Sequence, residues 1–160
     1  MRGRARAVFL AAGAALLVAT LGGLSTDIGP WYQSLKQPPW KPSDMWFGPV
    51  WTTIFALTAI AGYLAWTRAS TPGGRDSVLA ATAFNGALNV GWSLLFFRLR
   101  RPDWALYEVA ALWLSIVVMM LVFGRHSRLA ALLLVPYLAW VSFAAVLNAA
   151  VVRLNGPFAP

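Results

Sequence analysis

The chain has 160 residues, of which 59% are hydrophobic and only 11% charged, with nine tryptophans, ten prolines and no cysteine. A soluble globular domain is about 45–50% apolar and about a quarter charged, so this composition excludes a soluble enzyme and a disordered tail. The formal net charge is +8, but the basic residues lie between long apolar runs, as flanks of membrane spans do, so we expect no nucleic-acid partner. The lack of cysteine and the single histidine, His126, argue against a metal site.

Five apolar runs are long enough to cross a membrane as helices, which takes about 20 predominantly apolar residues each. They cover residues 6–25, 47–68, 78–98, 103–123 and 129–153. Short polar connections separate the last four runs, so neighbouring helices run antiparallel. The sequence therefore predicts an all-α integral membrane protein, a single domain over residues 1–160 formed by a bundle of five transmembrane helices. Basic residues are divided almost equally between the two ends of this bundle, so the positive-inside rule leaves the orientation open.

The first run has a second interpretation. Arg2, Arg4 and Arg6 precede it, and a basic segment followed by an apolar stretch is also typical of a signal peptide. No Ala-x-Ala cleavage site follows the run. We therefore expect the first helix to be retained, with cleavage as the alternative.

The connection over residues 26–46 is far longer than usual for a helical bundle. Proline stiffens its backbone, and its tryptophan rings supply large apolar faces. An interfacial aromatic belt would also place tryptophan and tyrosine at this depth, but a belt needs no cluster of prolines. We therefore predict a structured lid over the mouth of the bundle. The residues that carry this prediction are Pro30, Trp31, Tyr32, Pro38, Pro39, Trp40, Pro42 and Trp46.

Polar and aromatic residues share one face of the third run. Asn85, Asn89, Trp92 and Phe96 follow one another at spacings of four, three and four, which places them on one side of a helix. The carboxamides need hydrogen-bond partners, because hydrocarbon offers none. They either join helices to one another or form the polar wall of a ligand cavity.

The fifth run repeats this pattern with Tyr137, Trp140, Ala144 and Asn148. Trp140 lies near the middle of its span, too deep for an interfacial belt, so its indole N–H needs a partner in protein or in a cavity. Pro136 lies in the same run and permits a kink, because proline lacks the N–H of a helical hydrogen bond.

Glu108 lies on one face of the fourth run with Trp104 and Ser115. An intramembrane carboxylate is a functional-site hypothesis by default. Glu108 is about 7 Å from the expected helix start at 1.5 Å per residue, so pairing with Arg98, Arg100 or Arg101 at the interface is the alternative.

The opposite face of the third run carries small residues. Ala83, Ala87 and Gly91 recur every four residues and point away from the two asparagines. Rows of this kind let helices approach closely. They serve either packing within one chain or the interface of a homodimer.

Several motifs together resemble one family. Ordered along the chain, they are Trp31-Tyr32, Pro38-x-Trp40-x-Pro42, Gly48-Pro49-Val50-Trp51, Ala87-Leu88-Asn89 with Trp92 and Phe96-Phe97, Trp104-Ala105-Leu106 with Glu108, and Pro136-Tyr137-x-x-Trp140-x-x-Phe143-Ala144 with Leu147-Asn148. From about residue 8 to residue 154 the chain resembles the tryptophan-rich sensory protein/translocator protein family (TspO/MBR, the peripheral benzodiazepine receptor family).

The resemblance implies a five-helix bundle, usually a homodimer, with a pocket beneath the first loop. It implies tetrapyrroles, sterols or synthetic benzodiazepine-type compounds as ligands, with no required cofactor. The dimer interface is expected at Ala83, Ala87 and Gly91. The implied pocket residues are Tyr32, Trp40, Pro42, Trp51, Phe55, Asn85, Asn89, Trp92, Tyr137, Trp140, Phe143, Ala144 and Leu147.

Three functions follow as expectations. The first is a membrane receptor, sensor or carrier for protoporphyrin IX-like tetrapyrroles and similar hydrophobic molecules in a bacterial cell membrane. The second is light- and oxygen-dependent breakdown of porphyrin, which the resemblance links to Trp51 and Trp140, the two candidate catalytic residues. The third is a small proton-coupled exporter that uses Glu108. The sequence contains no Ser/His/Asp set and no phosphate-binding loop, so a binding protein is favoured over an enzyme. Animal members carry a C-terminal cholesterol pattern with a tyrosine where this chain has Ala149, which argues against a dedicated cholesterol function.

Overall fold

A computed structural model describes Gly13, Thr20 and residues 22–158 of the chain. Most of the predicted first span, and with it the signal-peptide alternative, lies outside these described residues. Residues 22–25, which end that predicted span, are helical.

The described part of the chain is helical and contains no strand. After α2 (Pro30–Ser34) and the short 3-10 helix η1 (Asp44–Trp46) come the long helices α3 (Phe47–Arg68), α4 (Pro72–Ser93), α5 (Pro102–Gly124) and α7 (Val135–Asn155). The π-helix η2 (Leu94–Arg98) extends α4, and α6 (Arg128–Leu133) precedes α7. Four stretches are long and apolar enough to cross a membrane. The all-α membrane class is confirmed, whereas the count of five spans is not: the described residues contain four.

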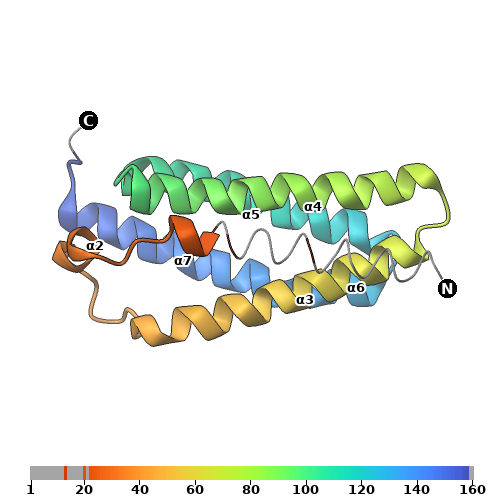
Figure 1. Cartoon of the computed structure of the whole chain (residues 1–160), viewed down its shortest axis with the longest axis horizontal. Coiled ribbons are helices and arrows are strands. Elements are labelled where there is room, and N and C mark those ends of the chain that lie inside the picture. The colour runs from red at the N-terminus through yellow and green to blue at the C-terminus, as the bar shows by residue number, and fades with distance from the viewer. Residues whose placement is uncertain (1–12, 14–19, 21, 159–160) are drawn as a thin grey trace.

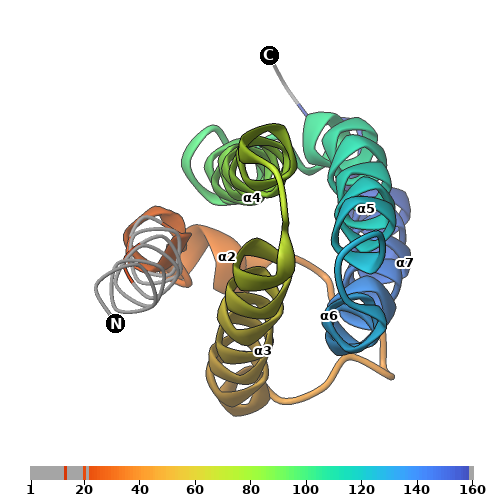
Figure 2. The same cartoon turned by 90° about the vertical axis from the view of Figure 1, so that its right-hand side faces the viewer.

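The long helices lie side by side, so the chain runs up and down along one axis (Figure 1). Viewed along this axis, α3 and α4 lie next to one another, and α5, α6 and α7 form the opposite side (Figure 2). Segment α2, the start of α3 and the end of α7 meet at one end of the bundle (Figure 1). The turn between α3 and α4 lies at the other end.

Helix ends follow the local chemistry of capping. Pro72 begins α4, and the Thr71 side chain accepts a hydrogen bond from the amide of Gly74 (3.1 Å), which caps the helix. This helix begins six residues before the predicted start at 78, because its first turn is polar and glycine-rich and so carries no hydrophobic signal. The predicted 129–153 helix is divided at Leu134 into α6 and α7. The division lies two residues before Pro136, which cannot donate a helical hydrogen bond.

The core consists of three clusters stacked along the bundle. Small residues of α3 let its backbone approach α5 and α6 closely at the end far from the lid. The far cluster includes Ala61, Ala65, Val78, Met119, Phe123, Ala130 and Leu134. The middle cluster includes Ile54, Val109, Leu112, Ile116, Tyr137 and Val141. The lid-end cluster includes Tyr32, Phe96, Ala105 and Val151, so the loop before α3 contributes to the core.

Candidate ligand cavity

A cavity of about 460 Å³ opens between α3, α4, α5 and α7, beneath the loop that contains α2. This volume lies within the range of about 300–1,000 Å³ that small-molecule sites occupy. Its described lining is mainly aromatic and aliphatic: Gly22, Gly23, Thr26, Ile28, Tyr32, Asp44, Phe47, Gly48, Trp51, Thr52, Phe55, Asn89, Trp92, Ser93, Phe97, Val109, Leu112, Trp140, Val141 and Ala144.

Tryptophan rings on three helices form the walls of the cavity. On α3, Trp51 stacks on Phe55, with ring centroids 5.3 Å apart and planes at 27°. On α7, the Trp140 ring meets Phe47 edge-on at 5.5 Å. On α4, the indole N–H of Trp92 is buried and has no hydrogen-bond partner among the described residues. The cavity thus offers flat apolar faces, which suit a planar ring compound.

A chain of hydrogen bonds lies behind this wall and joins α4, α5 and α7. The hydroxyl of Tyr137 accepts from Asn89 Nδ2 and donates to Asn85 Oδ1, both at 3.1 Å. The carboxamide of Asn85 then donates to Ser115 Oγ (2.8 Å), and that hydroxyl donates to the carbonyl of Leu112 (2.7 Å). Both asparagines therefore join helices, as the first interpretation predicts, and Asn89 in addition lines the cavity, as the second predicts.

Asn148, predicted to share a face of α7 with Tyr137, Trp140 and Ala144, joins two helices and does not line the cavity. It is 1% exposed and lies outside the cavity lining. Its carboxamide, oriented to suit its neighbours, donates to the carbonyl of Pro102 and accepts from the amide of Leu106, both at 3.1 Å. Asn148 therefore fastens α7 to the backbone at the start of α5.

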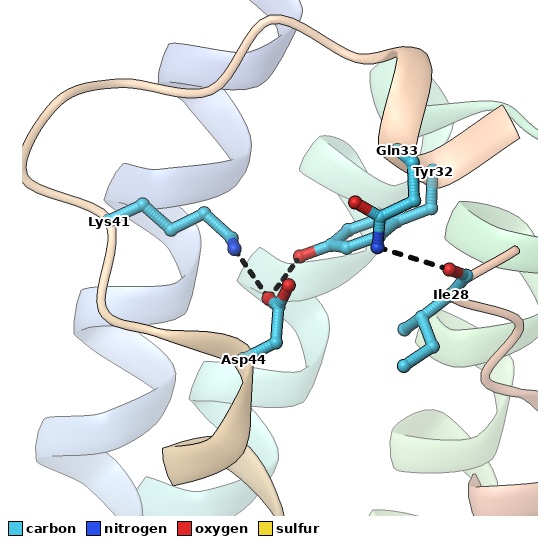
Figure 3. A network of polar contacts seen from close by, with 5 residues as sticks. All are labelled: Ile28, Tyr32, Gln33, Lys41 and Asp44. Atoms are coloured by element: carbon cyan, nitrogen blue, oxygen red, sulfur yellow. Dashed lines mark hydrogen bonds and ion pairs between the residues drawn. The ribbon is translucent and has the colours of Figure 1, made fainter. Parts of the chain in front are cut away.

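The loop before α3, hereafter the lid loop (residues 26–46), carries its own polar network at the cavity mouth (Figure 3). Asp44 Oδ1 accepts a hydrogen bond from the hydroxyl of Tyr32 (3.0 Å) and pairs with the ammonium of Lys41. Burial and the bond to Asp44 raise the pKa of the Tyr32 phenol well above its usual range, so this hydroxyl stays a donor at physiological pH. Gln33 Nε2 donates to the carbonyl of Ile28 (3.3 Å) within the same loop.

The end of α7 holds the lid loop from outside. Asn155 accepts from the amide of Lys36 (2.8 Å) and donates to the carbonyl of the same residue (2.9 Å). The Trp40 ring contacts Phe143 of α7 edge-on at 6.0 Å. These contacts connect the loop to the bundle at positions far apart in sequence, as a lid requires.

The predicted pocket residues separate into two groups. Trp40 and Phe143 contact each other outside the cavity lining, and Asn85 and Tyr137 lie behind its wall. Two further residues, Pro42 and Leu147, do not line the cavity either. The remaining members do line it, and their role in binding stays a prediction: Tyr32, Trp51, Phe55, Asn89, Trp92, Trp140 and Ala144.

Several residues that line the cavity were not among those predicted from the sequence. Gly48 and Thr52 lie at helical spacing from Trp51 and Phe55, so the face that they share could have revealed them. Phe97 lies in the π-helix η2, in which the amide of Leu99 bonds to the carbonyl of Leu94 (2.9 Å). No local sequence pattern predicts this π-helix, so the position of Phe97 could not be predicted. Further missed residues include Asp44, Phe47, Ser93 and Val141.

The small-residue row of α4 is divided by the structure. Ala83 and Ala87 are exposed on the outside of the helix. Gly91 is half-buried and faces α5, where a Cβ would come within 3.9 Å of Glu108 Oε1. Gly91 therefore lies where α4 meets α5, at a place where a Cβ would make only an ordinary van der Waals contact, and Ala83 and Ala87 remain available for a partner.

Glu108 does not make the predicted interfacial ion pair. Arg98 donates to the carbonyl of Leu24 (2.5 Å), Arg101 pairs with Asp103 (2.6 Å), and the Arg100 guanidinium lies over the Trp31 ring. Both carboxylate oxygens of Glu108 are buried without a hydrogen-bond partner in the described part of the chain. The interfacial alternative fails because each arginine has another partner: Arg101 within the start of α5, and Arg98 and Arg100 in segments that precede α3.

Fold and site together define a multi-pass helical membrane protein with a tryptophan-walled cavity beneath a structured loop. The chain belongs to the TspO/MBR family, whose model matches residues 9–154. It is 42% identical over 129 residues to the tryptophan-rich protein TspO of Chlorobaculum tepidum, which covers 78% of this chain and 79% of that protein. It is 35% identical over 129 residues to the human translocator protein (78% and 75% covered) and 35% identical over 131 residues to protein CrtK of Rhodobacter capsulatus (79% of each).

Proposed function

We propose that this membrane protein is a receptor, sensor or carrier that binds planar tetrapyrroles of the protoporphyrin IX type, and similar hydrophobic ring compounds, in the cavity beneath the lid loop. The observation that carries the proposal is the cavity of about 460 Å³ walled by the rings of Trp51, Trp92 and Trp140. Flat indole faces stack on a flat macrocycle, and apolar walls favour a ligand that partitions into the membrane.

Titration of the purified protein with protoporphyrin IX, first in darkness and then in light, tests this function. Saturable quenching of tryptophan fluorescence in darkness is the expected result. Quenching that rises linearly with porphyrin, as in protein-free micelles, would contradict the proposal.

Light-dependent porphyrin breakdown is the second candidate. The observation in its favour is that Trp51 and Trp140, its candidate residues, both line the cavity. Its signature is a product that forms only with light and oxygen and that disappears in Trp→Phe variants. Simple binding gives no such product.

The proton-coupled exporter remains a third candidate, because Glu108 is a carboxylate without a partner at membrane depth among the described residues. Transport in vesicles that depends on a pH gradient, and that Glu108→Gln abolishes, would favour it. A carrier without proton coupling shows neither dependence.

Replacing Trp51 or Trp140 with Phe should weaken porphyrin binding about 2- to 12-fold. Phenylalanine keeps most of the apolar area but loses the indole N–H and part of the stacking face, which is worth about 0.5–1.5 kcal/mol, and 1.4 kcal/mol is tenfold in affinity. Dissociation constants from tryptophan quenching and melting temperatures of the unliganded protein are measured together. If these rings only fill the core, melting falls while affinity stays unchanged, and both residues leave the site.

We also propose that the protein forms a homodimer through the exposed side of α4 that carries Ala83 and Ala87. Small residues let a second helix approach closely, and close van der Waals packing between helices drives their association in a membrane. Ala87→Leu should shift the protein from dimer to monomer in light scattering in detergent, with Leu114→Ala on the outer face of α5 as a control. An intact dimer in Ala87→Leu would remove this interface.

A further inference from the structure

The cavity has a single charged corner at its lid end. Among the described residues that line the cavity, Asp44 carries the one charged side chain. Its ion-pair partner, Lys41, is absent from that lining. Figure 3 shows both residues reaching toward one another from the loop before α3. The negative member of the pair therefore faces the ligand space, and the positive member stands behind it.

Lys41 is held away from the cavity by rings as well as by charge. Its ammonium lies 5.5 Å from the ring centre of Tyr32 and 5.9 Å from that of Phe47, and its side chain is 12% exposed against 38% for Asp44. Both rings attract a cation. The ammonium is thus fixed between two rings and one carboxylate oxygen, where it neutralises Asp44 in part.

The second oxygen of Asp44 is unused. Oδ1 takes both the Tyr32 hydroxyl and the Lys41 ammonium. Oδ2 has no hydrogen bond or ion pair with any residue that the structure describes. A ligand in the cavity therefore meets a free, negatively charged acceptor at the lid end, and apolar rings along the walls.

We infer that Asp44 sets the charge selectivity of the cavity, favouring ring compounds whose lid-facing groups are neutral or cationic over those that present a carboxylate. The inference rests on the proposed binding function and specifies which tetrapyrroles the cavity prefers. An N–H donor gains a charge-assisted hydrogen bond to Asp44. A ligand carboxylate instead meets a like charge at a partly enclosed site, where the repulsion is stronger than in bulk water.

Three tetrapyrroles with one ring system test the inference: protoporphyrin IX with its two carboxylates, its neutral dimethyl ester, and a diamide that carries terminal amines. Each is titrated in darkness against the full chain in detergent, and affinities are compared between variant and wild type for each ligand, which removes differences in detergent partitioning. Asp44→Asn keeps an acceptor for the Tyr32 hydroxyl. It should tighten binding of the diacid about tenfold (1.4 kcal/mol), weaken binding of the diamine severalfold, and leave the ester unchanged.

Two further variants serve as a control and as a test with the opposite expected effect. Asp76→Asn removes the same charge at the start of α4, at the opposite end of the bundle (Figure 1), and should leave all three affinities unchanged. Lys41→Gln removes the partial neutralisation of Asp44 and should weaken binding of the diacid severalfold relative to the ester. This second change moves selectivity in the opposite direction, so the inference can be tested even if Asp44→Asn fails to fold.

The outcomes separate the inference from the function on which it rests. If the wild-type protein binds none of the three compounds saturably, the proposed function fails. If the ester binds but Asp44→Asn changes the diacid no more than Asp76→Asn does, the inference is wrong and the function stands. Equal weakening of all three ligands by Asp44→Asn would also overturn it, because Asp44 would then act by holding the lid loop.

Discussion

Tyr137→Phe should lower the free energy of unfolding by about 2 kcal/mol. The hydroxyl that is lost bonds to both Asn85 and Asn89, each at 3.1 Å. Removing one partner leaves buried polar groups unsatisfied, at about 1–3 kcal/mol in soluble proteins and somewhat less in membranes, where the unfolded chain also finds partners. Reversible unfolding in mixed detergent micelles measures the change.

The control for this variant is Tyr107→Phe. Tyr107 lies on α5 and is 81% exposed, so its hydroxyl holds no helices together. The control should unfold like the wild type. Equal stability of the two variants would show that the hydroxyl of Tyr137 does not stabilise the bundle.

Asn155→Ala should release bound porphyrin about tenfold faster. The Asn155 carboxamide makes two hydrogen bonds to the backbone of Lys36, at 2.8 and 2.9 Å. At a net worth of about 0.5–1.5 kcal/mol each, their loss shifts the lid loop toward an open state by about a factor of ten, since 1.4 kcal/mol is tenfold. The dissociation rate is followed by competition after mixing with lipid vesicles.

The melting temperature of the unliganded bundle should change little in Asn155→Ala, because Asn155 is the last residue of α7. Gln33→Ala is the matched control, since Gln33 bonds to Ile28 within the same loop and not to the bundle. Equal release rates for Asn155→Ala and Gln33→Ala would mean that the lid loop does not control exit from the cavity.

Much of the fold can be predicted from local sequence. A transmembrane helix is recognised by its apolar length alone, so the ends of α3 (Phe47–Arg68) and α5 (Pro102–Gly124) agree with prediction to within a residue. A period of 3.6 residues also places Asn89 with Trp92 on one face of α4, and both line the cavity. A helix end made of polar residues, such as the first turn of α4, is not detected by a search for apolar residues.

Local sequence therefore specifies the class of protein, the course of its long helices and which residues share a helix face, since all three depend on neighbours along the chain. Local sequence does not specify that Asn85 joins helices while Asn89 lines the cavity, or that Asn155 bonds to Lys36, 119 residues away, because both depend on contacts between separate segments. The charged corner at Asp44 likewise depends on the tertiary structure. The fold of the lid loop places the Asp44 carboxylate in the cavity lining and leaves Lys41 outside it. Hydrogen bonds and ion pairs of this kind depend on distances of a few ångströms between separate segments, and no periodicity within a single segment encodes them.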